Sequence, residues 1–143
     1  MRAPLPASVR AAPVLLLLAL ALAGCTGQPK ISDCGLSVFV PGRAIDEGWR
    51  FDVKEVAGPA KELDGVSYRF LNRTDAGEQE AVFAGNLGQL RDSGGNNTLK
   101  YIDQGDDRRL GVGDAFVARV PMEMVLQLSQ GSTIVGTSRG CEG

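Results

Sequence analysis

The chain has 143 residues, and its 15 Lys and Arg residues against 17 Asp and Glu residues give a formal net charge of −2. An acidic chain without a basic cluster is poorly matched to phosphate backbones, which argues against nucleic acid as a partner. The chain contains no histidine. The commonest general base and metal ligand is therefore missing, and catalytic triads of the Ser-His and Cys-His kinds are excluded.

The first 24 residues have the pattern of a cleaved signal peptide. Arg2 and Arg10 give a positive start, and the apolar run Val14–Ala23 is about half the roughly 20 residues that a membrane-spanning helix needs. The segment Leu22–Cys25 (LAGC) resembles the lipobox of prokaryotic lipoprotein precursors. The resemblance implies diacylglycerol transfer to the Cys25 thiol, cleavage before Cys25, and a mature protein anchored stably by several acyl chains. An ordinary signal peptide with an incidental cysteine is the alternative.

The expected location is extracytoplasmic, with the lipid on Cys25 holding the protein to a membrane. Thr26 stands where an Asp would favour retention in the inner membrane, so the outer membrane is the default. The outer face of the cytoplasmic membrane of a single-membrane organism stays open. We expect residues 25–33 to form the lipidated N-terminus and a tether. Residues 34–143 then form one domain, long enough to bury a modest core.

Two cysteines remain once Cys25 is lipidated. Cys34 and Cys141 lie near the two ends of the expected domain, in an oxidising setting where cysteines are expected to pair. In the loop-entropy model a disulfide closing a loop of this length stabilises the fold by about 4–5 kcal/mol, as an upper figure. Two buried free thiols are the alternative, and a metal site built from these two alone lacks ligands.

Alternation of apolar and polar residues predicts a chain made mostly of strands with one buried face. Turn-forming segments rich in Gly, Pro, Asn and Asp separate the alternating stretches. The predicted strands lie in Leu36–Val40, Trp49–Val53, Val66–Phe70, Leu99–Asp103, Ala115–Val120, Met122–Leu128 and Thr133–Thr137. Seven or eight short strands at this spacing predict an all-β fold, a single β-sandwich of immunoglobulin-like layout. Trp49, the only tryptophan, opens one of these strands, and we expect it in the core rather than in a ligand site.

The segment Glu78–Leu90 fits two structures. Phe83, Leu87 and Leu90 are spaced as on one face of a helix, with Asp75 and Glu78 placed for a capping box. The run Ala81–Phe83 suits a strand instead, and the two glycines within the segment each weaken a helix by about 1 kcal/mol. We expect a strand followed by a loop.

The twelve residues from Asp103 to Asp114 have the length of a calcium-binding loop. In an EF-hand-type loop Asp103, Asp107 and Asp114 would fill positions 1, 5 and 12. Position 3 is a glycine without a side-chain oxygen, and position 6 is Arg108, whose Cβ disfavours the left-handed backbone that glycine adopts there. We therefore expect the site to be vacant, with the carboxylates capping turns and pairing with arginines. Weak calcium binding is the alternative, and no other cofactor is expected.

The segment around this loop resembles secreted β-sandwich domains of archaeal pilin-like and cell-surface proteins. Those domains carry a Y-x-D…L-x-x-G-D strand–loop–strand, matched here by Tyr101, Asp103, Leu110, Gly113 and Asp114. The likeness spans about a third of the mature chain, without the N-terminal helix of a pilin. The resemblance implies a β-sandwich fold and gives little information about activity.

These observations predict a non-enzymatic, lipid-anchored binding or assembly module of the cell envelope, whose partner is an envelope protein or a glycan. A second hypothesis is that the protein inhibits a secreted hydrolase, such as a lysozyme or protease, because small β-sheet lipoproteins held by a disulfide can act as such inhibitors. A degenerate calcium-binding surface domain is a third. A hydrolase that uses the acidic pair Asp106 and Asp107 is the remaining alternative.

Overall fold

The computed structural model describes residues 34–73 and 79–139, and the strands and helices lie within these ranges. The strands are β1 (Val38–Phe39), β2 (Gly42–Ile45), β3 (Gly48–Asp52), β4 (Glu55–Val56), β5 (Lys61–Glu62), β6 (Ser67–Arg73), β7 (Gln79–Asn86), β8 (Leu99–Ile102), β9 (Arg109–Leu110), β10 (Ala115–Ala118), β11 (Met124–Gln130) and β12 (Thr133–Thr137). A 3-10 turn, η3 (Leu63–Gly65), and a short helix, α2 (Leu87–Asp92), complete the described elements. None of these helices is long and apolar enough to cross a membrane.

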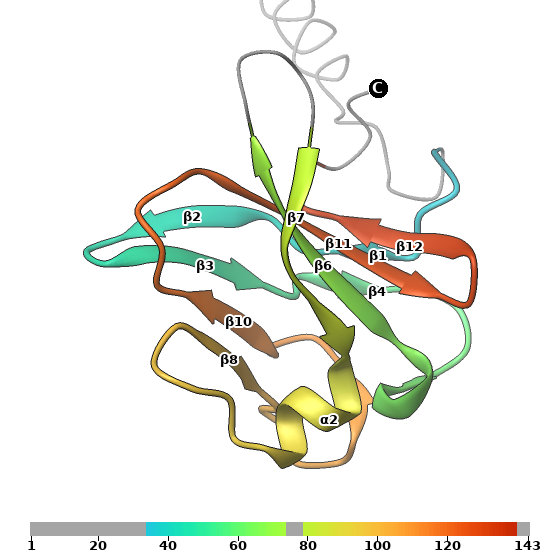
Figure 1. Ribbon diagram of the computed structural model, residues 1–143. Helices are drawn as coiled ribbons and strands as arrows, with labels where there is room; N and C mark the ends of the chain where they lie inside the picture. Colours follow the sequence, from blue (N-terminus) through green and yellow to red (C-terminus); the bar gives the residue numbers. More distant parts are fainter. Residues whose placement is uncertain (1–33, 74–78, 140–143) are drawn as a thin grey trace, which may run out of the picture.

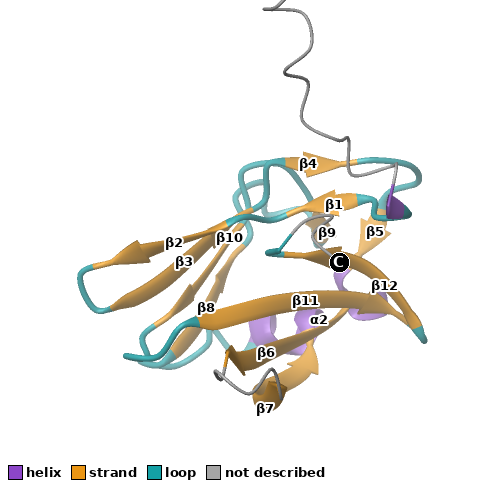
Figure 2. Cartoon of the chain, turned by 90° about the horizontal axis from the view of Figure 1, so that it is seen from above, coloured by secondary structure: helices purple, strands orange, loops and turns teal. Residues whose placement is uncertain are grey.

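Two sheets build the domain. The larger has the strand order β4-β1-β12-β11-β6-β7 and the smaller has the order β2-β3-β10-β8, with β5 and β9 forming a separate pair. Neighbouring strands are antiparallel except β1 and β12, which run parallel. The four-stranded sheet occupies the left of Figure 2, and the six-stranded sheet curves from β7 at the bottom to β4 at the top. The fold is therefore all-β and sandwich-like, as the alternation predicted.

Each segment predicted as a strand contains one, and eight of the twelve described strands have four residues or more. β2 is the strand of that length which the alternation did not predict. Three of its four residues are exposed. Neither face of the strand is buried, so its sequence does not alternate between apolar and polar residues. It pairs along its whole length with β3, and the two strands form the hairpin that projects to the left in Figure 1.

Phe70 stands at the centre of the core between the two sheets. Its ring is fully buried and meets the rings of Phe51 and Phe116, from the other sheet, edge-on at centroid distances of 5.6 and 6.0 Å. Phe83 of the neighbouring strand packs against the same ring at 6.1 Å. Edge-to-face pairs of this kind each contribute about 0.5–1.5 kcal/mol beyond the burial of their area. These contacts fix the face of each strand that points inward.

The prediction for residues 78–90 was right for the strand and wrong for the loop. β7 ends at Asn86, and α2 follows it directly, at the lower end of the molecule in Figure 1. The side chain of Asn86 caps the helix by accepting a hydrogen bond from the N–H of Gln89 at 3.1 Å. Gly88 lies inside the helix, where an added Cβ would lie 2.0 Å from Oδ1 of Asp64. A larger residue there would require the exposed side chain of Asp64 to move aside.

Candidate functional site

The sequence-predicted site residues fall partly inside the described ranges. Cys25 and Cys141 lie outside them, and Cys34 is the first residue described. Lipidation of Cys25 and the Cys34–Cys141 disulfide therefore stay predictions. The three aspartates assigned to a metal, Asp103, Asp107 and Asp114, are all described.

Asp114 is a structural anchor of the loop that precedes it. Its carboxylate is 2% exposed and accepts three hydrogen bonds. Tyr101 Oη donates to Oδ2 at 2.5 Å, the N–H of Gly111 donates to Oδ2 at 2.8 Å, and the N–H of Gln104 donates to Oδ1 at 2.9 Å. Burial and the hydrogen bond to Asp114 both raise the pKa of Tyr101 far above its usual value. Both ends of the loop are thus tied to one buried carboxylate.

The other two aspartates are engaged in separate contacts. Oδ2 of Asp103 accepts from Arg91 Nε at 3.0 Å and from the N–H of Arg108 at 3.2 Å. Its other oxygen is buried without a hydrogen-bond partner. Asp107 caps its own turn, accepting from the N–H of Arg109 at 3.0 Å. Within residues 34–73 and 79–139, no group of three His, Cys, Asp or Glu residues is placed to hold a metal. The structure does not bring the predicted ligand set together.

Two arginines pair with the carboxylates in and around this loop. Arg91 forms ion pairs with Asp92, Asp103 and Asp106. Arg108 pairs with Asp92, and with Asp64 at 2.9 Å. The hydrogen bond from Arg108, assisted by the bond from Arg91, holds the pKa of Asp92 below its usual value.

These contacts fasten the loop to α2 and η3, and they match the expectation that carboxylates cap turns and pair with arginines. Arg108 nevertheless has the left-handed backbone that its Cβ disfavours, with a φ of 58° and a cost of about 1–2 kcal/mol.

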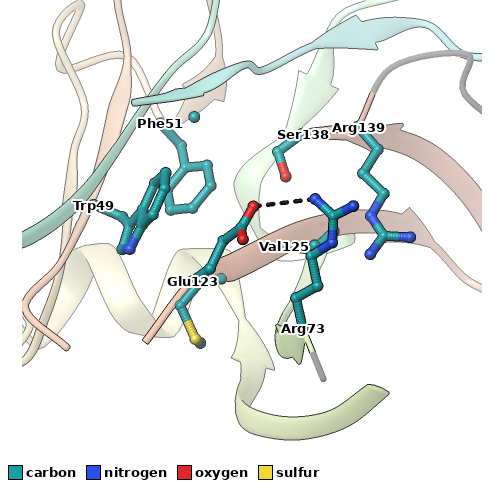
Figure 3. Close-up of a pocket in the computed structure, with 9 residues that line it drawn as sticks. Trp49, Phe51, Arg73, Glu123, Val125, Ser138 and Arg139 are labelled. Carbon is teal, nitrogen blue, oxygen red and sulfur yellow. Dashed lines mark hydrogen bonds and ion pairs between the residues drawn. The ribbon is translucent and has the colours of Figure 1, made fainter. Parts of the chain in front are cut away.

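A different site opens at one end of the sandwich, where Figure 3 shows a pocket with residues from both sheets. We call it the Trp49 pocket, and its cavity has a volume of about 240 Å³. It is lined by Gly42, Trp49, Phe51, Arg73, Glu123, Met124, Val125, Ser138 and Arg139. A second cavity of about 430 Å³, lined by Ala44, Ile45, Asp46, Glu47, Gly48, Trp49, Arg119, Val120 and Pro121, shares Trp49 with the first.

Trp49 sits at the boundary between the core and solvent. The period of two along β3 places its ring on the same face as that of Phe51, which is fully buried. Trp49 itself is half-buried and packs on the edge of the core. Gly48 before it allows this close pairing, because a Cβ there would lie 2.1 Å from the carbonyl oxygen of Ala118. The indole packs against the core without being buried in it, so the expected core position is only partly confirmed, and it lines two cavities.

Charged side chains face the two aromatic rings across the Trp49 pocket. In Figure 3 Glu123 lies between the rings and the guanidinium groups of Arg73 and Arg139. Arg73 Nη1 pairs with Glu123 Oε1 at 3.1 Å, and both side chains are about half exposed. Ser138 Oγ accepts from the N–H of Leu126 at 3.0 Å, which leaves its hydroxyl proton free to donate elsewhere. The pocket therefore combines charged side chains with an aromatic surface.

The polar residues of the Trp49 pocket could not be predicted from the sequence. Arg73 and Glu123 are 50 residues apart in the chain, and neither stands in a catalytic or ligand-binding motif. They meet because β6 pairs with β11, with Asn72 opposite Met124. The single tryptophan at the start of an alternating strand was the one local signal. No family model, curated protein or solved structure matches the chain.

Proposed function

We propose that this chain is a lipid-anchored binding module of the cell envelope, which captures a ligand or partner without catalysing a reaction. The observation that carries the proposal is the Trp49 pocket. It combines a half-buried indole with arginine, glutamate and serine side chains at one end of a packed sandwich. A few placed polar groups beside an aromatic surface are typical of sites that bind and orient a ligand.

The segment Leu22–Cys25 supports the anchoring half of the proposal. Acyl chains on Cys25 would hold the chain at a membrane surface, and residues 25–33 would form a tether. To test this, cells expressing the full chain are fed an alkyne-labelled fatty acid. We expect label on the wild-type protein and its recovery with membranes. The Cys25→Ser variant should lose both, and a labelled Cys25→Ser variant would overturn the anchor.

The binding half is tested by photo-crosslinking in cells. A photoreactive phenylalanine analogue replaces Glu123, at the rim of the Trp49 pocket. In the matched control it replaces Glu62, a similarly exposed glutamate that pairs with Arg109. We expect a discrete adduct from position 123 that is absent from position 62. Equal or no adducts at both positions would contradict the assignment of this pocket as the binding site.

A second candidate function, inhibition of a secreted hydrolase, is favoured by Val112. This side chain is 66% exposed, between two glycines. The buried carboxylate of Asp114 holds the N–H of Gly111, and the N–H of Gly113 donates to the carbonyl of Val53 at 3.1 Å. A fixed turn that presents one apolar side chain suits insertion into an active-site cleft. The test is inhibition of a panel of lysozymes and proteases, with Val112→Asp expected to abolish it. Unchanged hydrolase rates with the wild-type protein would remove this candidate.

A further inference from the structure

We propose that the outer face of the four-stranded sheet rests on a membrane surface that carries anionic phospholipids. This inference rests on the lipid anchor of the proposed function and adds the orientation in which the anchored domain meets its membrane. It follows from a row of cations across the sheet, from the ion pairs around that row, and from the length of the tether.

The register of the four-stranded sheet places three cations in one row. Arg43 of β2 is opposite Arg50 of β3. Val117 of β10 is opposite Arg50 on one side and Lys100 of β8 on the other. These four residues, which we call the basic row, point away from the core, because the residues that follow Arg50 and precede Val117 are fully buried phenylalanines. The strands that carry the row lie side by side on the left of Figure 1.

The basic row is open to solvent. The side chain of Arg43 is 63% exposed, Lys100 is exposed, and Arg50 and Val117 are half-buried. Since neighbouring strands are about 4.8 Å apart, the row spans roughly 14 Å. Donors spread over four strands suit an extended anionic surface better than one small anion.

Asp52 holds the two arginines of the row side by side. Like charges that are directly opposite on neighbouring strands destabilise a sheet. Here Oδ2 of Asp52 accepts from Nε of Arg43 at 3.2 Å, and Oδ1 accepts from Nε of Arg50 at 2.8 Å. In the part of the chain that the structure describes, neither guanidinium group makes another hydrogen bond. Both therefore keep their terminal NH₂ groups as donors for an anionic headgroup.

The face stays positive after its ion pairs are counted. Asp52 balances one of the two arginines, and Arg119, beyond the end of β10, is balanced by Glu47 at 3.8 Å. Lys100 forms no ion pair with any residue that the structure describes. One arginine and Lys100 thus remain, whereas the whole chain has a formal net charge of −2. This asymmetry would turn the basic row toward an anionic surface.

Protection of the sheet edges does not account for the basic row. Charged residues on edge strands discourage pairing with another chain, and β2 and β8 are the edge strands of this sheet. Arg50, however, lies on the interior strand β3, where no such protection is needed.

The tether keeps this face within reach of the headgroups. Residues 25–33 would separate the lipid from Cys34, and they span at most about 30 Å when fully extended. Such confinement raises the effective concentration of headgroups around the face. Each Lys or Arg near an anionic leaflet favours contact by roughly fivefold. Two charges are therefore enough to bias the orientation of a domain that cannot diffuse away.

The test is photo-crosslinking of the lipidated protein in vesicles. The full chain, processed in cells, is reconstituted into phosphatidylcholine vesicles with or without phosphatidylglycerol. A photoreactive phenylalanine analogue replaces Val117, within the basic row. In the matched control it replaces Gln127, which is also half-buried, on the outer face of the other sheet. At position 117 we expect lipid adducts that increase about fivefold or more with phosphatidylglycerol and decrease as salt rises. Position 127 should show no such increase.

Charge variants locate the contact on the basic row. Lys100→Gln and Arg43→Gln, each with the analogue at position 117, should lower the adducts in phosphatidylglycerol vesicles by roughly fivefold. Arg69→Gln is the matched control, because Arg69 is exposed on the outer face of the other sheet, and it should change nothing. Unfolding curves verify that each variant is folded. Adducts at position 117 that do not depend on phosphatidylglycerol, or equal adducts at positions 117 and 127, would overturn the inference.

Failure of this inference is distinguishable from failure of the anchor. If the wild-type protein takes up no fatty-acid label and is not recovered with the vesicles, the anchor is wrong. If the protein is recovered with the vesicles without lipid adducts at position 117, the anchor stands and the orientation is wrong. A discrete protein adduct at position 117 in cells, in place of lipid adducts, would overturn the membrane contact in favour of an acidic protein partner.

Discussion

The hydroxyl of Tyr101 donates a 2.5 Å hydrogen bond to Oδ2 of Asp114, and both side chains are buried. The bond joins the end of β8 to the start of β10 across the loop Asp103–Asp114, which has the length of a calcium-binding loop. Leu110, which is buried, and Gly113, whose φ is 99°, complete the same unit. The Y-x-D…L-x-x-G-D pattern therefore has a structural role here, because Tyr101 and the turn before Asp114 are held by one buried carboxylate.

Replacing Asp114 by Asn should destabilise the fold by about 3 kcal/mol, measured by denaturant unfolding. An asparagine side chain has one acceptor oxygen where the carboxylate has two. Its NH₂ group would replace one of these oxygens and face the N–H of Gln104 or of Gly111, which would then have no acceptor. Tyr101→Phe should cost about 1.5–3 kcal/mol, the range for a hydrogen bond to a charged group. Asp107→Asn is the control and should change little, since its oxygen can still accept from Arg109. Equal effects of the two Asn variants would contradict the anchoring role of Asp114.

Stability should fall at high pH because of the tyrosines. The pKa of Tyr101 is raised by burial and by Asp114, and that of Tyr68 is raised by burial. A raised folded-state pKa contributes stability that is fully present below the unfolded value of about 10 and is lost as the pH rises above it. Each tyrosine kept protonated lowers the free energy of unfolding by about 1.4 kcal/mol per pH unit there. Tyrosinate absorbance should therefore appear together with unfolding. Its appearance in the native protein near pH 10 would contradict the assignment.

Calcium should leave the thermal stability unchanged. Asp103, Asp107 and Asp114 make separate contacts, and Arg91 and Arg108 occupy the surroundings. Melting curves in excess EDTA and in millimolar calcium should superimpose. A site filled at about 100 times its dissociation constant would add roughly 2.7 kcal/mol. An increase in melting temperature on that scale, lost in Asp103→Asn, would restore the calcium loop.

Gly48→Ala should destabilise the protein by about 2 kcal/mol or more and disturb the Trp49 pocket. The backbone there has a φ of 152°, and the added Cβ would lie 2.1 Å from the carbonyl oxygen of Ala118, which belongs to backbone and cannot rotate away. Gly65→Ala is the matched control, since its Cβ would meet nothing within 4 Å. That change should be neutral or slightly stabilising. Unfolding curves of the two variants, with tryptophan fluorescence as the probe, separate these outcomes.

The sequence by itself determined the strands whose two faces differ. Burial of one face requires apolar residues at every second position. The strands β3, β6 and β11 can therefore be predicted from the alternation within their own segments. The sequence did not reveal the helix after β7, because two glycines obscured it and the capping residue considered for this segment was Asp75, not Asn86. The close approach of the Asp64 side chain to Gly88, 24 residues away in the chain, is a tertiary contact that the local sequence does not reveal.

Only the tertiary structure decided how the charged residues are paired and where the pocket lies. Asp103 and Asp114 look alike in the sequence, yet one carboxylate pairs with Arg91 of α2 and the other is buried against Tyr101. Arg73 and Glu123 are joined by the register of β6 with β11, and Trp49 faces them from the other sheet. Strand order and register depend on contacts between distant segments. Alternation within one segment specifies which face is buried but not which strand lies beside it.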